Sequence, residues 1–171
     1  MCLAPERRPP GDSVVAVVRV RLLAAPTRRE VEELAEIFDR YRAHYGEASD
    51  VLRSASWLDE NLGASRLRVY VAEDSSRFVG FAITVDVPAS LRLAHFWQIR
   101  DLFVLPGYRR QGIGRSLLAS VRDAASASGA LRLVLQTEDD NNPALRLYAD
   151  CGYTAVSGYR SLMLPLGREP A

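Results

Sequence analysis

The sequence predicts one domain built on a mixed β-sheet with helices on both faces. The chain has 171 residues, of which 48% are apolar and 25% charged, so it can bury one substantial core. Its apolar pattern changes between strand-like and helix-like periods in the order β-α-α-β-β-β-α-β-α-β-β. No repeat or internal linker interrupts this order. We therefore expect a single domain over residues 13–168, preceded by a disordered tail over residues 1–12.

The first strand and helix are predicted from their composition and their end signals. Residues 14–23 are rich in β-branched side chains, which favour a strand. Thr27 followed three positions later by Glu30 is a capping box, which predicts that a helix begins there. Apolar residues continue at helical spacing, and Gly46 is expected to end this helix.

The next elements are predicted to be a short helix and a β-hairpin. The helix covers residues 51–62. Strands at residues 67–73 and 78–85 are joined by a polar turn at residues 74–77. Pro88 is expected to break the strand pattern after this hairpin.

The middle of the chain is predicted to contain a long strand followed by a long helix. The strand covers residues 95–104, and a turn with proline and glycine follows it. The helix runs from residue 112 to about residue 126, with Gly129 as its stop. A further strand is expected at residues 131–136.

The C-terminal part is predicted to contain one short helix and two strands. Asn142 before Pro143 indicates an N-cap followed by proline at the first helical position, so the helix covers residues 143–151. The last strands are expected at residues 153–156 and 160–166.

Composition excludes several classes of protein. The 22 basic residues, all arginine, face 21 acidic residues, and a net charge of +1 lacks the excess positive charge that nucleic acids attract. No apolar run approaches a membrane span, and no secretory signal is visible. Two cysteines and two histidines predict neither a disulfide framework nor a metal site. We therefore expect a cytoplasmic protein with no nucleic-acid, membrane or metal partner.

The segment from Asp101 to Arg115 has the features of a phosphate-binding turn. A strand ends at Val104, and a helix starts within Arg-Gln-Gly-Ile-Gly-Arg. Gly112 and Gly114 remove side chains where backbone could approach a ligand. Free N–H groups at a helix N-terminus bind phosphate, and the nearby guanidinium groups add charge of the right sign.

Two motifs identify the chain as similar to a known family. Arg109-Arg-Gln-Gly-Ile-Gly114 resembles the (Gln/Arg)-x-x-Gly-x-(Gly/Ala) coenzyme A signature of the GNAT acyltransferase superfamily. The segment from Asn141 to Tyr153 resembles the family's Asn-x-x-Ala-x-x-Leu-Tyr-x-x-x-Gly-(Phe/Tyr). The order of predicted elements also matches. Tyr41 to Gly46, Tyr-Arg-x-x-Tyr-Gly, further resembles a bacterial group described as histone- or diamine-acetyltransferase-like.

This resemblance implies the GNAT fold, with a mostly antiparallel sheet, and an acetyl-CoA-dependent N-acetyltransferase. The acetyl group would move to a primary amine by direct attack in a ternary complex. The strand before the turn would pair with the pantetheine arm, a bulge in it would part it from the next strand, and one of its backbone N–H groups would polarise the acetyl carbonyl. Asn141 would form a hydrogen bond near the pantetheine, which leaves Asn142 as the helix cap. The residues implied in coenzyme binding are Leu102, Phe103, Val104, Arg109, Arg110, Gln111, Gly112, Ile113, Gly114, Arg115, Asn141 and Tyr148.

The resemblance also implies catalytic roles. Tyr148 matches the family's general acid, and a phenol is protonated at neutral pH and can donate to a departing thiolate. The base stays open between Asp101 and Glu138, with a water relay as a third route. In polyamine acetyltransferases a glutamate often precedes the aspartate, whereas Arg100 stands here, which argues against a polyamine acceptor.

The acceptor pocket is expected beside the first two helices. Residues 30–60 carry nine acidic residues against three arginines, which favours a small cationic amine as acceptor. Tyr41, Tyr45 and Glu47 are the candidate acceptor contacts, although two tyrosines four residues apart also suit a core-facing helix. The alternative function is a non-catalytic acyl-CoA-binding sensor on the same fold. A homodimer, common in the family, is a candidate assembly.

Overall fold

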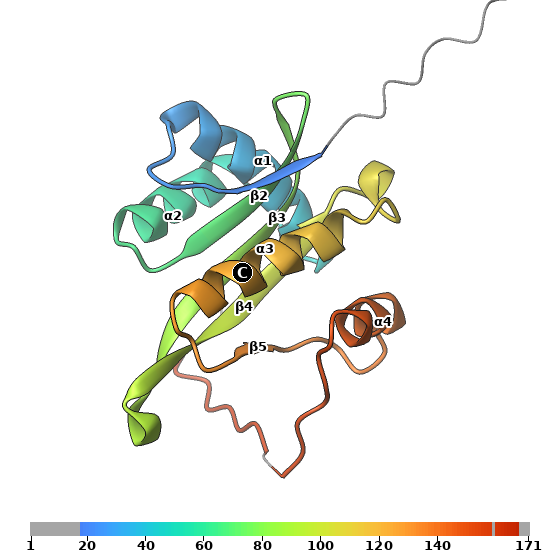
Figure 1. Cartoon of the computed structure of the whole chain (residues 1–171). Coiled ribbons are helices and arrows are strands. Elements are labelled where there is room, and N and C mark those ends of the chain that lie inside the picture. Colours follow the sequence, from blue (N-terminus) through green and yellow to red (C-terminus); the bar gives the residue numbers. More distant parts are fainter. Residues whose placement is uncertain (1–17, 159, 168–171) are drawn as a thin grey trace, which may run out of the picture.

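The computed structural model describes residues 18–158 and 160–167, so the expected tail and the start of the first strand lie outside the described residues. Five strands form one sheet in the order β1-β2-β3-β4-β5 (Figure 1). Neighbouring strands from β1 to β4 are antiparallel, and β4 and β5 are parallel. The expected mixed, mostly antiparallel sheet is confirmed. The strands are β1 (Arg19–Leu22), β2 (Arg68–Asp74), β3 (Arg77–Ala89), β4 (Ala94–Val104) and β5 (Leu133–Leu135).

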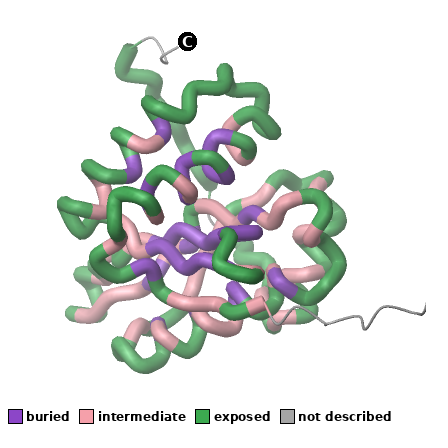
Figure 2. The backbone as a smooth tube through the Cα atoms, turned by 90° about the horizontal axis from the view of Figure 1, so that it is seen from above, coloured by how far each residue is buried: buried purple, intermediate pink, exposed green. Residues whose placement is uncertain are grey.

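Helices cover both faces of the sheet because side chains alternate along the strands. Phe81 of β3 packs in the core beneath α1 and α2, whereas the neighbouring Ala82 packs in the core beneath α3. Figure 2 shows the buried residues gathered between these layers. The helices are α1 (Arg28–His44), α2 (Val51–Gly63), α3 (Ile113–Ala127) and α4 (Asn142–Asp150). In the described part of the chain, none of them is long and apolar enough to cross a membrane.

The capping box that predicted the start of α1 is present. The Thr27 hydroxyl accepts a hydrogen bond from the Glu30 N–H at 3.3 Å, and the Glu30 carboxylate accepts one from the Thr27 N–H at 2.8 Å. Arg21 of β1 also contacts Glu30 at 2.7 Å, so the first strand and the first helix are joined at this cap.

Two expectations about strands are wrong. Pro88 does not break the pattern, because β3 continues to Ala89 with Pro88 opposite His95. The registered pairs of β2 with β3 end at Thr84, so the proline lies where β3 has a partner on one side only. Residues 153–156 and 160–166 are not strands in the described chain, and side chains such as Leu162 (90% exposed) lie in solvent. Their β-like pattern finds no partner strand there.

Candidate active site

A large cleft of about 1000 Å³ opens beside the second half of β4. Segments far apart in the sequence form its walls: the end of α1, β4 from Ile99 onward, the start of α3, the segment after β5, and α4. Almost all the expected site residues line it. The exceptions are Gln111, whose amide donates to the Gly107 carbonyl at 3.2 Å, and Glu47, which faces Arg42 at 3.7 Å.

The cleft exists because β4 carries a bulge. Ile83 of β3 pairs with Asp101, but the next residue, Thr84, pairs with Ile99, so Arg100 is an extra residue without an opposite partner. The parallel pairing of β4 with β5 extends only from Trp97 to Ile99. Beyond the bulge the two strands have no registered pairs, which leaves the β5-facing side of β4 open to a ligand.

One end of the cleft is made of backbone at the start of α3. The first helical hydrogen bond of α3 runs from the Ser116 N–H to the Gly112 carbonyl, at 3.0 Å. The three N–H groups before it have no partner inside the helix, as at every helix start. Gly112 and Arg110 both adopt positive φ angles, 82° and 64°, which shape the turn. Such a turn fits a pyrophosphate.

Helix α4 packs tightly against this end of the cleft. A Cβ at Gly114 would come within 3.1 Å of Leu147, so glycine allows α3 and α4 to approach each other. Arg115 reaches across to Asp150 at 3.0 Å. The Arg109 guanidinium donates to the Val104 carbonyl at 3.0 Å and lies over the Phe103 ring. Free N–H groups, guanidinium charge and an open strand edge together fit an acyl-coenzyme A.

The other end of the cleft holds two carboxylates in different surroundings. Asp101 is partly buried, and burial raises the pKa of its carboxyl, although Tyr41 donates a hydrogen bond to it at 2.8 Å. Glu138 is exposed, and hydrogen bonds from its own backbone N–H and from the Asn141 side chain lower its pKa. The surroundings of the two carboxyl groups therefore shift their pKa values in opposite directions.

Asn141 has a structural contact that the sequence assigned to its neighbour. Its side-chain oxygen accepts from the Ala144 N–H at 3.3 Å, so Asn141 is the N-cap of α4. Its amide also donates to Glu138 at 3.3 Å. The expectation that Asn142 caps the helix is wrong by one residue, because Asn142 is already helical and Pro143 occupies the second position.

Tyr148 of α4 lies in the wall of the cleft with its phenol protonated. Burial, followed by the charges of Tyr45 and Glu138, raises its pKa to about 12. Its ring packs against Tyr153 at 5.8 Å between centroids. A partly buried phenol that keeps its proton at neutral pH is a suitable acid for a leaving thiolate.

Two tyrosines at the end of α1, Tyr41 and Tyr45, both line the cleft, and the ring of Tyr41 also packs in the core. The Tyr41 ring contacts Phe81 and Phe103, while its hydroxyl reaches Asp101. Tyr45 is 52% exposed at the mouth of the cleft. His44, which lies in the segment that the sequence assigned to the acceptor pocket, lines the cleft. Arg100 lines it too, although sequence reasoning did not place it in the site. The sequence signal for Arg100 was its place beside Asp101, and the family resemblance implied a bulge in this strand without locating it at Arg100.

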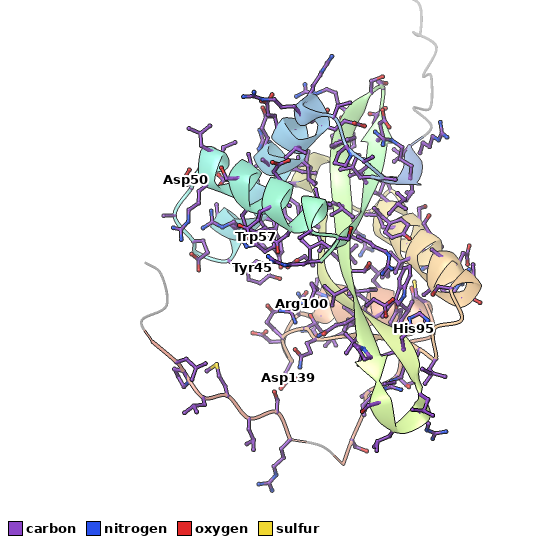
Figure 3. The ribbon with its side chains drawn as sticks, turned by 90° about the vertical axis from the view of Figure 1, so that its left-hand side faces the viewer. Tyr45, Asp50, Trp57, His95, Arg100 and Asp139 are labelled. Carbon is purple, nitrogen blue, oxygen red and sulfur yellow. The ribbon has the colours of Figure 1, made fainter. Side chains whose placement is uncertain are left out.

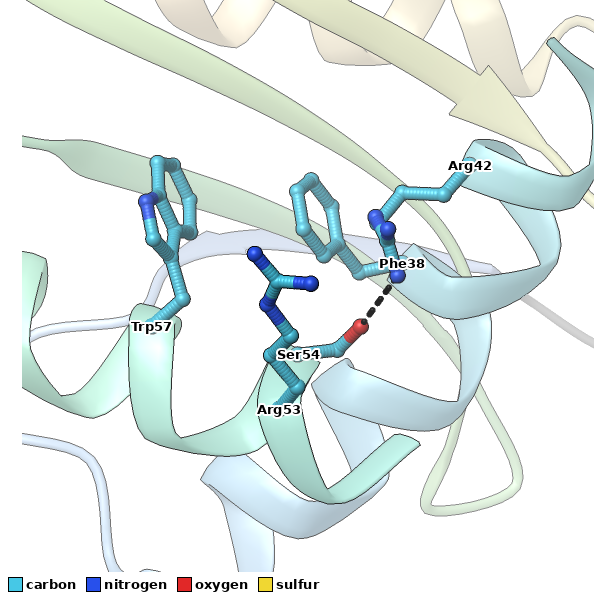
Figure 4. A pocket seen from close by; sticks show the side chains of 5 residues that line it. All are labelled: Phe38, Arg42, Arg53, Ser54 and Trp57. Carbon is cyan, nitrogen blue, oxygen red and sulfur yellow. Dashed lines mark hydrogen bonds between the residues drawn. The ribbon is translucent and has the colours of Figure 1, made fainter. Parts of the chain in front are cut away.

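A smaller pocket of about 240 Å³ lies between α1 and α2 (Figure 4). Arg42 donates there to the Ser54 hydroxyl at 3.4 Å and to the buried Asp39 at 3.3 Å. Asp39 also accepts hydrogen bonds from Ser49 and from the Asp50 N–H. These polar groups bind one another, and the network joins the two helices.

Comparison with known proteins agrees with this geometry. Residues 31–153 match the acetyltransferase (GNAT) family. An uncharacterised N-acetyltransferase of Bacillus subtilis is 33% identical over 126 residues, which is 74% of this chain and 85% of that protein. An IAA acetyltransferase of Azospirillum brasilense is 30% identical over 85% of this chain and 88% of its own.

Solved structures of acetyltransferases have a similar fold. The crystal structure of a probable acetyltransferase superposes with a TM-score of 0.81 at 26% identity, covering 88% of this chain and 99% of that one. An aminoglycoside acetyltransferase from a soil metagenome superposes with a TM-score of 0.75 at 19% identity, covering 88% and 97%. Because the family match extends over most of the sequence, the chain belongs to the GNAT family and is an N-acetyltransferase that uses acetyl-CoA.

Proposed function

We propose that this enzyme acetylates the primary amine of a small molecule by direct attack in a ternary complex. The observation that carries the proposal is that Asp101 and Tyr148, two groups with raised pKa values, line one cleft where β4 and β5 part. A base and an acid on one cleft are what direct transfer requires. The names of relatives, among them a phosphinothricin N-acetyltransferase of Streptomyces coelicolor, support a small-molecule acceptor.

In this proposal Asp101 removes the proton from the attacking amine. Burial raises the pKa of Asp101 and so favours its taking up a proton, whereas the lowered pKa of Glu138 suits a fixed negative charge that attracts the ammonium form. Tyr41 orients the Asp101 carboxylate through their hydrogen bond. The environments of the two carboxylates thus favour Asp101 where the sequence left both open.

Tyr148 acts at the other side of the transferred group. The new C–N bond forms as the C–S bond breaks, and the phenol gives its proton to the departing thiolate. Backbone N–H groups of β4 beyond Ile99 that face β5 have no strand partner there, and they are the candidate donors to the acetyl oxygen. The N–H groups around Gly112 and the arginines near them hold the pyrophosphate.

The proposal is tested by thiol release from acetyl-CoA with a panel of polyamines, diamines, aminoglycosides, amino acids and basic peptides. We expect rapid release with one class of amine. Calorimetry with acetyl-CoA alone serves as the control for coenzyme binding. Binding without release for any amine would support the acyl-CoA-binding sensor instead, and a failure to bind would contradict the assignment of the cleft.

A further inference from the structure

We propose that the acceptor is zwitterionic, with an anionic group a few bonds from its amine, and that Arg100 binds this anion. The inference rests on the proposed function, because it assigns Asp101 and Arg100 to two parts of one acceptor. It narrows the acceptor from primary amines in general to amino-acid-like molecules.

The bulge in β4 brings Arg100 to the cleft. Consecutive residues of a regular strand point to opposite faces, so the neighbour of Asp101 would ordinarily face away from it. Arg100 is the unpaired extra residue, and both residues line the cleft. Figure 3 shows Arg100 on the same side of the sheet as Tyr45, the residue that follows α1. The bulge therefore brings an arginine and an aspartate that are neighbours in the chain to the same cleft.

Of the five arginines that line the cleft, Arg100, Arg110 and Arg146 have no ion pair or side-chain hydrogen bond among the described residues, and of these three only Arg100 adjoins Asp101 in the chain. Arg115 forms an ion pair with Asp150, and Arg109 is held by the Val104 carbonyl and the Phe103 ring. Arg100 is exposed, and among the described residues no carboxylate lies within ion-pair distance of it. Its charge is felt nearby, since it lowers the pKa of Asp101 against the larger effect of burial. A guanidinium left open in a ligand cleft suits a carboxylate or phosphonate.

These two charges together limit the acceptor. Arg100 and Asp101 line the same cleft, so an acceptor that reaches both must carry an amine and an anion in one small molecule. An α- or β-amino acid meets this condition. A diamine does not, because a second ammonium near Arg100 would be repelled.

The experiment compares each amino acid with the amine that remains when its carboxylate is removed. Lysine with cadaverine, methionine with 3-(methylthio)propylamine, and tyrosine with tyramine are among the pairs, extended to all the standard amino acids. Calorimetry measures their binding to the enzyme saturated with coenzyme A, so no turnover is required. We expect at least one amino acid to bind more tightly than its amine, by on the order of tenfold to a hundredfold.

Variants then assign the preference to Arg100. Arg100→Gln should remove the preference by weakening binding of the zwitterion, and Arg100→Lys should restore part of it. Arg92→Gln, in the 3₁₀ turn Ser90–Arg92 at the far end of the β3–β4 hairpin, is the matched control and should keep it. If no pair favours the zwitterion, or if Arg100→Gln keeps the preference, the inference is wrong.

The same experiment separates this inference from the proposed function. Thiol release with simple amines, without any preference for zwitterions, would overturn the anion site and leave the transferase intact. Tight, Arg100-dependent binding of a zwitterion without thiol release would overturn the transfer and support the anion site.

Discussion

The two ends of the cleft are built in different ways. At the end that we propose for the coenzyme, called the coenzyme end, one continuous segment from Arg109 to Arg115 supplies the turn, the free N–H groups and the positive charge. At the acceptor end, Tyr41, Asp101 and Glu138 come from α1, β4 and the segment after β5. The first end depends on backbone conformation and is readable as a local motif. The second depends on side chains that only the fold brings together, so it can change without changing the motif.

The largest effect is expected at the coenzyme end. Gly112→Val should weaken binding of acetyl-CoA at least about a hundredfold, because a side chain would disturb the turn whose N–H groups hold the pyrophosphate. Gly129→Val is the matched control: its φ is 78° against 82° at Gly112, and for neither glycine does a described residue lie within 4 Å of an added Cβ. Both variants should lose about 1–2 kcal/mol of folding stability. Calorimetry and thermal melting separate the two effects, and normal binding by Gly112→Val would contradict the assignment.

The next largest effect is expected at the acceptor end. Asp101→Asn should lower kcat/KM by about 10²- to 10⁴-fold and leave acetyl-CoA affinity unchanged, because the amine loses its base. In the wild type, activity should rise with pH as Asp101 deprotonates, with the midpoint above the ordinary value because burial raises its pKa. The variant should lack this rise. Glu138→Gln is the comparison and should cost less; a larger loss there would exchange the roles of the two carboxylates.

Tyr148→Phe tests the group between the two ends. We expect a loss in kcat of about tenfold to a hundredfold, at the lower side of general acid catalysis, because a thiol with a pKa near 8.5 is already a fair leaving group. Coenzyme affinity should stay the same. Tyr153→Phe is the control, since its ring packs against Tyr148 and its buried hydroxyl has no hydrogen-bond partner among the described residues. Equal turnover for the two variants would remove Tyr148 from the mechanism.

The smallest effect is expected at the opposite end of β4, away from the cleft. Both His95 ring nitrogens face oxygen, Asp86 at 2.8 Å and the Ser128 carbonyl at 3.1 Å, and these contacts raise its pKa. A raised pKa in the folded state stabilises the protein below the unfolded pKa of about 6.5. This contribution is lost as the pH rises through the folded value. Melting temperatures from pH 5 to 8 should therefore show a small decline that His95→Gln abolishes, with coenzyme binding unaffected.

The sequence predicted the parts of the fold that depend on local signals. Thr27 and Glu30 located the start of α1 to the residue, because a capping box is a contact between near neighbours. Asn142 was misread because Asn141 beside it offers the same side chain, and only the hydrogen bond to Ala144 distinguishes them. The apolar pattern of residues 160–166 predicted a strand, but a strand also needs a partner, which a pattern does not contain.

The same limit applies to the site. The motif from Arg109 to Gly114 predicted the coenzyme end, and the structure adds only that Gln111 turns away from the cleft. The family resemblance implied a bulge in this strand, but its position at Arg100 was not visible, because it is defined by register against Thr84 and Ile83 of another strand. In the sequence, Tyr41 suited both a core position and a ligand-contact position. In the structure its ring packs in the core, and its hydroxyl reaches Asp101 in the cleft.

The parting of β4 and β5 has a consequence for the lifetime of the protein. Three registered residue pairs join β5 to β4. A bound coenzyme that contacts both strands beyond these pairs would add contacts that hold the two strands together. Anything that binds only the folded state stabilises it, by about 2.7 kcal/mol at a hundred times its dissociation constant. The abundance of this enzyme in a cell should then follow the supply of acetyl-CoA, because scarcity would expose the unliganded form to unfolding and proteolysis.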